Sequence, residues 1–180
     1  ACLTRFTDQA ISWLTSHQQQ HADTPFFLYL PLTSPHKPVI PLVRFRGQGK
    51  AGAYGEFMIE TDYHIGRILD YLDQAKLSKN TLVIFSSDNG GQVSVGANNG
   101  GLRDGKQSVY EGGLKVPTCA SWPGRIEPGS RSDLMALSMD LFPTVCAVAR
   151  APLPGGAKGV ERIEGRSILP TLLGKAQMEL

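Results

Sequence analysis

Asp88 and Asn89 are the first residues of this sequence whose types and spacing could do chemistry. They directly follow the apolar run Thr81–Ser86, which is rich in β-branched residues and predicts a buried strand. A carboxylate and an amide at a strand end supply the hard oxygen ligands that Ca²⁺ or Mg²⁺ takes. An Asp-Asn-Gly sequence is also typical of a simple turn. Taken alone, the stretch favours the turn, so the rest of the chain has to decide.

His36 is the second candidate. It follows the apolar run Pro25–Leu32, which predicts another buried strand, and it lies in a loop stiffened by two prolines. Because the carboxyl ends of such strands open on one edge of the sheet, we expect His36 near Asp88. A rigidly held histidine suits a proton donor or an anion ligand, whereas an exposed loop histidine is the alternative. The remaining histidines lack this context and are interpreted as surface residues: His17, His21 and His64.

Lys106 is the third candidate. The segment Gly100–Gln107 is similar to a phosphate-binding P-loop, but Gln107 stands where Ser or Thr is required. No strand directly precedes the segment, so we reject a nucleotide site. A lysine on a glycine-rich backbone could still bind a tetrahedral oxyanion as a point charge. The alternative is a solvated surface lysine. Glu111, a little further on, is expected to have a structural role.

Length, charge and cysteine usage narrow the class of protein. The chain has 180 residues, 41% hydrophobic and 19% charged, which suits one globular domain with a full core. A net charge of +2 argues against a nucleic-acid partner, and no apolar run reaches the length of a membrane span. Of the three cysteines, Cys119 and Cys146 lie in apolar surroundings and are expected to be buried thiols.

The elements that must position these residues alternate between helix and strand. Apolar spacing predicts helices over residues 7–20, 54–75, 137–150 and 167–173, and a further strand over residues 116–122. Residues 90–113 form a long glycine-rich segment, and such segments in compact domains are usually functional or disordered. This order of elements predicts an α/β sheet with crossover helices.

The ordered motifs resemble the sulfatase family, within the alkaline-phosphatase-like superfamily. The resemblance covers nearly the whole chain and is nearest to the arylsulfatase and N-acetylgalactosamine-sulfatase branch. It implies a mainly parallel sheet flanked by helices. The residues that carry it are Ser34–Pro38, Ile65–Arg67, Asn80–Gly91, Asn99–Gly100, Leu102–Arg103, Gly105–Lys106, Glu111–Gly113, Val116–Pro117, Trp122–Gly124, Asp140–Thr144 and Gly165–Ser167.

The resemblance also implies roles for the candidate residues. Asp88 and Asn89 match the family's metal-ligand pair, usually for Ca²⁺ and otherwise for Mg²⁺. Lys106 matches a lysine that contacts the sulfate and neutralises its charge, and His36 matches the histidine beside the leaving-group oxygen, a candidate general acid. The implied activity is hydrolysis of sulfate esters through a formylglycine nucleophile, with a sulfated small molecule or glycan as substrate. The alternatives are a phosphate or phosphonate ester hydrolase of the same superfamily and a non-catalytic domain that binds an anion or a metal.

The chain departs from the family pattern at the nucleophile. Formylglycine is made from the first residue of a Cys-x-Pro-x-Arg or Ser-x-Pro-x-Arg motif. None of the cysteines begins such a motif, we expect no serine form of it, and the family's first metal-binding Asp-Asp pair is absent. We therefore expect residues 1–180 to be the second half of a catalytic domain, without the formylglycine segment or the small C-terminal domain, and inactive alone. Exposed sheet surface and a homodimer through it are expected. The resemblance suggests a periplasmic, secreted or lysosomal compartment.

Overall fold

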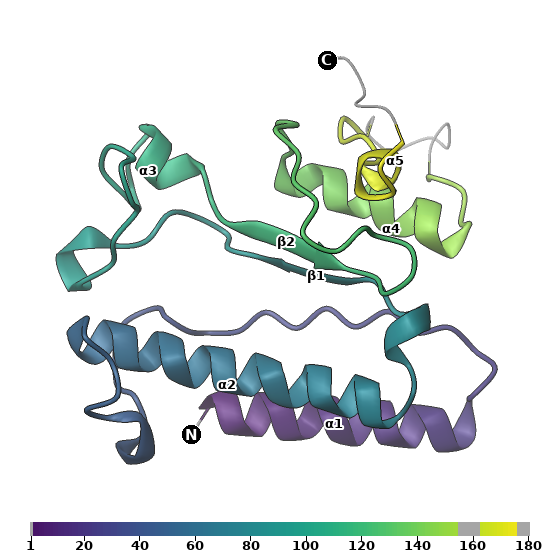
Figure 1. The fold of residues 1–180 in the computed structure, drawn as a ribbon, viewed down its shortest axis with the longest axis horizontal. Coiled ribbons are helices and arrows are strands. Elements are labelled where there is room, and N and C mark those ends of the chain that lie inside the picture. Colours follow the sequence, from purple (N-terminus) through teal and green to yellow (C-terminus); the bar gives the residue numbers. More distant parts are fainter. Residues whose placement is uncertain (1, 155–162, 176–180) are drawn as a thin grey trace. The chain divides into compact units, whose positions relative to one another are not determined.

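The computed structural model describes residues 2–154 and 163–175. The chain forms two compact units: unit 1 is Ala1–Ser78 with Ser86–Thr118, and unit 2 is Lys79–Phe85 with Cys119–Leu180. The helices and strands are drawn in Figure 1: α1 Cys2–Gln20, α2 Gly52–Gln74, β1 Val83–Ser86, α3 Glu111–Leu114, β2 Thr118–Ser121, α4 Leu141–Ala149 and α5 Leu169–Leu172. The four candidate site residues belong to unit 1, so the packing within that unit places them: His36, Asp88, Asn89 and Lys106.

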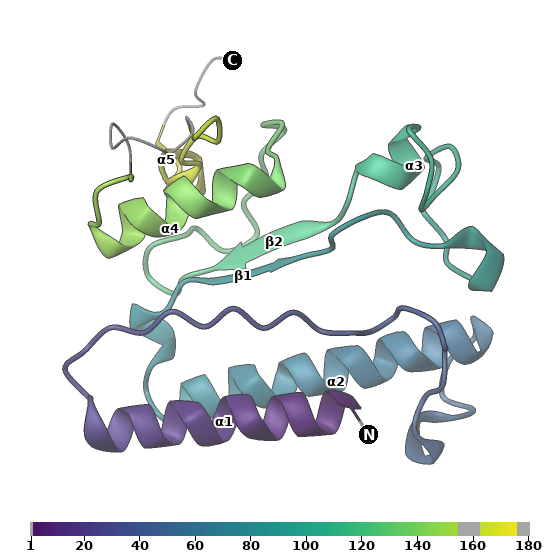
Figure 2. The same ribbon diagram turned by 180° about the vertical axis from the view of Figure 1, so that it is seen from behind.

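Helices α1 and α2 lie side by side and run in the same direction (Figures 1 and 2). Their contacts advance in step along both helices, because Thr4 meets His64 near the start and Gln18 donates to the Ala75 carbonyl at the end. The inward face of α1 is mainly apolar, as the spacing predicts, whereas α2 buries polar residues as well as Leu72. Helix α1 begins at residue 2 rather than at residue 7, and α2 at residue 52 rather than at residue 54. The buried core residues of this pair are Leu3, Ala10, Leu14 and Leu72.

The segment Pro25–Leu32 was expected to be a buried strand, and that expectation is wrong. The chain is extended there, and exposure alternates: Phe27 and Tyr29 are 67% and 77% exposed, whereas Phe26 is half-buried against the ring of Trp13. Within the described ranges, the backbone of residues 25–32 makes no hydrogen bond. The alternation typical of a strand is present, but a strand also needs a hydrogen-bonded neighbour.

Strands β1 and β2 form a two-stranded sheet. Ser86 at the end of β1 faces Thr118 at the start of β2, with their hydroxyl oxygens 2.8 Å apart, so the two strands run antiparallel. The prediction of an α/β chain is confirmed, whereas the predicted parallel order is not found in the sheet of the described residues. The physical reason is that the expected parallel neighbour, residues 25–32, forms no ladder.

In unit 2, two of the recognised motifs hold each other in place. The Asp140 carboxylate accepts hydrogen bonds from the backbone N–H groups of Leu137 and Arg166, each at 2.8 Å. The Thr144 hydroxyl donates to the Asp140 carbonyl and accepts from the Ile168 N–H. These motifs therefore have a structural role, since they tie the start of α4 to the chain before α5.

Two further features of the described chain are the exposure of its cysteines and the length and apolarity of its helices. Cys119 is exposed and Cys146 is half-buried, so the expectation of buried thiols is wrong. Cys119 lies in β2, and most of that strand is exposed because little of the described chain covers it. No helix in residues 2–154 or 163–175 is long and apolar enough to cross a membrane.

Candidate active site

Asp88 and Asn89 leave the end of β1 as an open corner. Asp88 is exposed, and within the described chain its carboxylate has no hydrogen bond or ion pair. The Asn89 side-chain N–H₂ donates to the Gly90 carbonyl at 2.9 Å, which fixes the amide and leaves its oxygen available. A free carboxylate beside a fixed amide oxygen fits a Ca²⁺ or Mg²⁺ ligand pair.

The corner supplies only part of a metal-ligand set. Calcium usually takes about six to eight oxygen ligands. Among the residues that the structure describes, no group of three or more His, Cys, Asp or Glu side chains could hold a metal ion. Ligands beyond Asp88 and Asn89 would therefore have to come from other groups.

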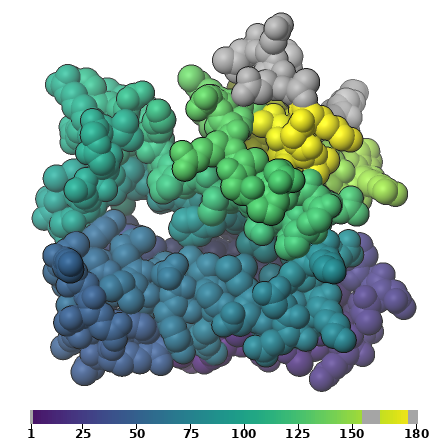
Figure 3. Space-filling model, viewed as in Figure 1, coloured from purple at the N-terminus to yellow at the C-terminus, as the bar shows by residue number. Residues whose placement is uncertain are grey.

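The glycine loop, residues 90–113, is held by contacts between backbone atoms. The Gly90 N–H donates to the Gly113 carbonyl, and the Gly112 N–H donates to the Arg103 carbonyl, each at 2.9 Å. A Cβ on Gly90 would lie 1.7 Å from the Gly112 oxygen, and one on Gly112 would lie 2.1 Å from the Asp104 oxygen. Gly90 and Gly112 must therefore be glycine, because a side chain would collide with the backbone. In Figure 3 the loop forms one lobe, coloured teal-green at the upper left.

The same packing brings Lys106 to the metal-ligand corner. The Lys106 N–H donates to the Gly91 carbonyl at 3.1 Å, and Gly91 is two residues after Asn89. A Cβ on Gly105 would lie 2.3 Å from that same carbonyl oxygen. Lys106 is half-buried and makes no ion pair with any described carboxylate. It lines a pocket of about 360 Å³ together with Gln92, Val93, Ser94, Asp104, Gly105 and Gln107.

Asn99 is a positioning residue that the sequence analysis noted only as part of a motif. Its side-chain oxygen accepts from the Gly91 N–H at 2.8 Å, and its N–H₂ donates to the Gly91 and Asp104 carbonyls, each at 3.0 Å. One amide thus pairs with both polar groups of Gly91 and bridges to the residue before Gly105. An asparagine inside a glycine-rich loop was the available signal, because its side chain complements a peptide group.

The His36 loop, residues 34–42, is held at both ends by one turn of α2. The Ser34 and Thr61 hydroxyl oxygens lie 2.7 Å apart, and the Leu42 N–H donates to the Glu60 carboxylate at 2.8 Å. Glu60 and Thr61 are only 1% and 4% exposed. Sequence reasoning missed both, although consecutive polar residues on the inward side of an amphipathic helix are a signal that they have buried partners.

His36 itself is exposed at the surface of this loop. Its Nδ1 lies 2.8 Å from the Lys37 carbonyl oxygen, so Nδ1 carries the hydrogen and Nε2 is left for a ligand. No hydrogen bond or ion pair links His36 to Asp88, Asn89 or Lys106 among the described residues. The structure thus brings Lys106 to the corner and places His36 in the same unit on a separately supported loop.

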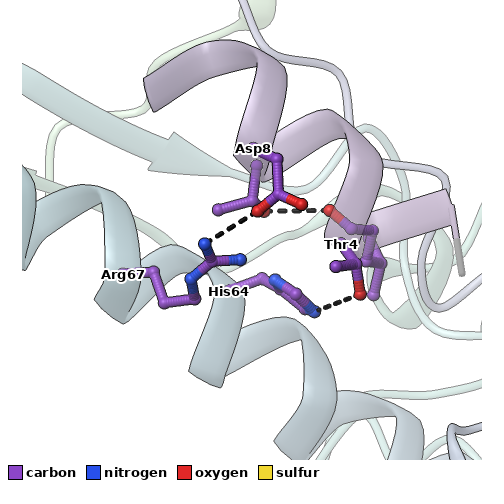
Figure 4. A network of polar contacts seen from close by, with 6 residues as sticks. Thr4, Asp8, His64 and Arg67 are labelled. Carbon is purple, nitrogen blue, oxygen red and sulfur yellow. Dashed lines mark hydrogen bonds and ion pairs between the residues drawn. The ribbon is translucent and has the colours of Figure 1, made fainter. Parts of the chain in front are cut away.

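His64 was interpreted as a surface residue, and that interpretation is wrong. Its side chain is fully buried between α2 and α1, where Nε2 lies 3.4 Å from the Thr4 hydroxyl (Figure 4). Beside it, Arg67 and Asp8 form an ion pair at 2.7 Å across the same two helices. Burial lowers the pKa of His64, and the nearby Arg67 guanidinium lowers it further.

We expected no serine form of the nucleophile motif, Ser-x-Pro-x-Arg, in this chain, and that expectation is wrong. Ser121–Arg125 reads Ser-Trp-Pro-Gly-Arg and lies at the end of β2. Trp122 is buried, its carbonyl accepts from the Arg125 and Ile126 N–H groups, and the Arg125 guanidinium lies 4.7 Å from its ring centroid. These contacts give Ser121–Arg125 a structural role as a turn after β2.

Comparison with known proteins gives consistent matches. The family model described as Sulfatase matches residues 3–151. Steryl-sulfatase of Rattus norvegicus is 38% identical over 167 residues, which are 88% of this chain and 28% of that protein. N-acetylgalactosamine-6-sulfatase of Mus musculus is 38% identical over 178 residues, which are 96% of this chain and 33% of that protein. The chain thus spans about a third of the length of the curated relatives it matches.

Solved structures give the same picture. Ps i-CgsB in complex with k-i-k-neocarrahexaose has a TM-score of 0.85 at 29% identity, over 96% of this chain and 38% of that one. A Bacteroides thetaiotaomicron protein described under the metabolism of multiple glycosaminoglycans has a TM-score of 0.80 at 33% identity, over 96% of this chain and 36% of that one. In these solved structures, the part that matches this chain belongs to a longer chain.

Proposed function

Because this chain belongs to the sulfatase family, we propose that the protein containing it hydrolyses sulfate esters. The observation that carries the proposal is the hydrogen bond from the Lys106 N–H to the Gly91 carbonyl. It fixes the backbone of Lys106, whose ammonium group makes no ion pair with a described carboxylate, beside the segment that follows Asp88 and Asn89. An ammonium group and a hard cation together would bind the tetrahedral, singly charged sulfate group of an ester.

We assign a role to each candidate residue in this reaction. Lys106 contacts a sulfate oxygen and stabilises negative charge as the ester bond breaks. His36 acts as the imidazolium, with both ring nitrogens protonated: it gives the Nε2 proton to the departing alcohol oxygen and becomes neutral, while its Nδ1–H stays donated to the Lys37 carbonyl. Asp88 and Asn89 would hold Ca²⁺ or Mg²⁺, and a bound cation would supply further charge neutralisation at the sulfate. The formylglycine nucleophile of the family is assigned to residues outside this chain.

Sulfated glycans are the substrate class that we favour. One relative is named for N-acetylgalactosamine 6-sulfate chemistry, and a structural neighbour was solved with its substrate D-glucosamine-2-N,6-O-disulfate, at 26% identity and a TM-score of 0.56. The matched relatives are sulfatases, so a phosphate or phosphonate ester hydrolase is not favoured. A homodimer and a periplasmic, secreted or lysosomal compartment stay predictions.

The proposal is tested by an activity assay on the full-length protein that contains this chain. We expect release of 4-nitrophenol from 4-nitrophenyl sulfate, with little activity on 4-nitrophenyl phosphate. Lys106→Ala should lower kcat/KM by about a hundredfold or more, because it removes a charge that stabilises the transition state. Lys50→Ala, at an exposed lysine, is the matched control and should leave turnover unchanged. A preference for the phosphate ester, or full activity of Lys106→Ala, would contradict the proposal.

A further inference from the structure

Gln107 has a backbone conformation that its residue type does not explain. Four described residues other than glycine have a left-handed φ: Lys76, Asp104, Gln107 and Arg150. Lys76 and Arg150 end α2 and α4, where this conformation is usual. The Asp104 carboxylate accepts from the N–H of the next residue at 2.9 Å, which is the local bond that lets aspartate adopt it. Gln107, with φ of 76°, has neither reason.

The Gln107 side chain makes no contact that would stabilise the fold of the described residues. It is exposed, and in the part of the chain that the structure describes it makes no hydrogen bond. It lines the pocket of ≈ 360 Å³ beside Lys106. Glycine would adopt this φ without steric cost, so a glutamine here gives up stability and gains no contact. A residue that has an unfavourable backbone conformation and makes no stabilising contact is a candidate for a role in binding.

The chemistry of the pocket indicates what it would bind. Five of its seven lining residues have polar or charged side chains, and none is aromatic: Gln92, Val93, Ser94, Asp104, Gly105, Lys106 and Gln107. The Asp104 carboxylate is already engaged by the Gly105 N–H. Primary amides and hydroxyls donate and accept hydrogen bonds, so this lining suits uncharged polar groups better than a flat apolar ring system.

We propose that Gln107, with Gln92 and Ser94, forms a subsite for the hydroxyl or acetamido groups of a sulfated sugar. The proposal rests on the proposed function, because it takes the sulfate of the same molecule as the ligand of Lys106. It favours a sugar sulfate over a steroid or aryl sulfate as substrate. Gln107 is then a specificity residue, whose amide reads the sugar ring beside the sulfate.

Gln107→Gly in the product of the complete reading frame tests this subsite, because it removes the amide and also relaxes the backbone. We expect kcat/KM for N-acetylgalactosamine 6-sulfate to fall about tenfold, the effect of one lost hydrogen bond. Turnover of 4-nitrophenyl sulfate, which has no ring hydroxyls, should stay within about twofold of wild type by the same reasoning. Lys76→Gly is the matched control, since it relaxes another left-handed residue away from the pocket.

Binding measured by calorimetry separates this proposal from the activity. Wild type should bind N-acetylgalactosamine 6-sulfate about tenfold more tightly than inorganic sulfate, and Gln107→Gly should bind the two alike. If wild type hydrolyses neither ester, the proposed activity fails, and these affinities still decide the subsite. Equal wild-type affinities, an unchanged affinity in Gln107→Gly, or an equal loss on both substrates would overturn it.

Discussion

The glycine loop and the His36 loop carry the candidate site in two different ways. In the glycine loop, backbone atoms pack directly on backbone atoms, and a Cβ would lie as close as 1.7 Å to a carbonyl oxygen. In the His36 loop, two buried side chains of α2, Glu60 and Thr61, hold the two ends. The first loop is therefore fixed chiefly by close backbone contacts, to which the Asn99 side chain adds, and the second by a few side chains of α2 that could be replaced.

This difference decides which changes each loop tolerates. At Gly90, Gly105 and Gly112 of the glycine loop, an added carbon collides with rigid backbone, which cannot move away as a flexible side chain can. In the His36 loop, removal of an anchor leaves an unpaired backbone N–H but creates no collision. We therefore expect the largest single effects in the glycine loop and intermediate ones at the α2 anchors.

Gly112→Ala should have the largest effect. Its Cβ would lie 2.1 Å from the Asp104 oxygen and 2.5 Å from the Arg103 oxygen, so the loop has to open. We expect a loss of about 3 kcal/mol in the free energy of unfolding, the upper end for overpacking, together with faster amide exchange at Lys106. Urea unfolding and hydrogen exchange measure both.

Gly101→Ala is the matched control for that change, because nothing lies within 4 Å of a Cβ at this position. It should leave the stability and the exchange at Lys106 close to wild type. Equal behaviour of the two variants would show that backbone packing does not fix the glycine loop.

Glu60→Ala should have an intermediate effect, confined to the His36 loop. It leaves the Leu42 N–H without its partner and removes a side chain that is only 1% exposed. We expect a loss of about 2 kcal/mol, the cost of an unsatisfied buried donor, and faster amide exchange at Leu42 but not at Lys106. Glu60→Gln keeps an accepting oxygen and should restore most of the stability.

Glu56→Ala provides the control for the α2 anchors. Glu56 also accepts a backbone hydrogen bond, from the Gly47 N–H at 2.7 Å, but that bond is exposed to solvent. Its loss should cost little, because water replaces the acceptor. If Glu60→Ala and Glu56→Ala behave alike, burial of the anchor is not what holds the His36 loop.

The contrast also explains what the sequence could predict. Asp88, Asn89 and Lys106 are predicted from a strand end, a glycine-rich backbone and the family motifs, and one backbone hydrogen bond joins Lys106 to Gly91, two residues after Asn89. Their roles stay predictions. Glu60, Thr61 and His64 were missed because apolar spacing shows which face of α2 turns inward but not which polar residues find partners there. Residues 25–32 have the alternation of a strand, but a ladder depends on a neighbour that no local pattern specifies.

The smallest effect should come from acid acting on His64, which lies one turn beyond Glu60 on α2. Its pKa is lowered in the folded protein, chiefly by burial, so the unfolded chain takes up the proton first as the pH falls. Its contribution to stability is therefore complete above about pH 6.5, the unfolded value, and is lost progressively below it. Urea unfolding at pH 7.5 and pH 5.5 measures this loss.

His64→Leu should remove that part of the pH dependence, because the buried ring no longer titrates. His21→Leu, at an exposed histidine, should keep the wild-type dependence. Since His64 supports the helix pair that anchors the His36 loop, amide exchange at Leu42 should rise more at pH 5.5 than exchange at Lys106. A larger rise at Lys106, or the same pH dependence in His64→Leu and wild type, would break the distinction between a loop held by helix side chains and one held by its own backbone.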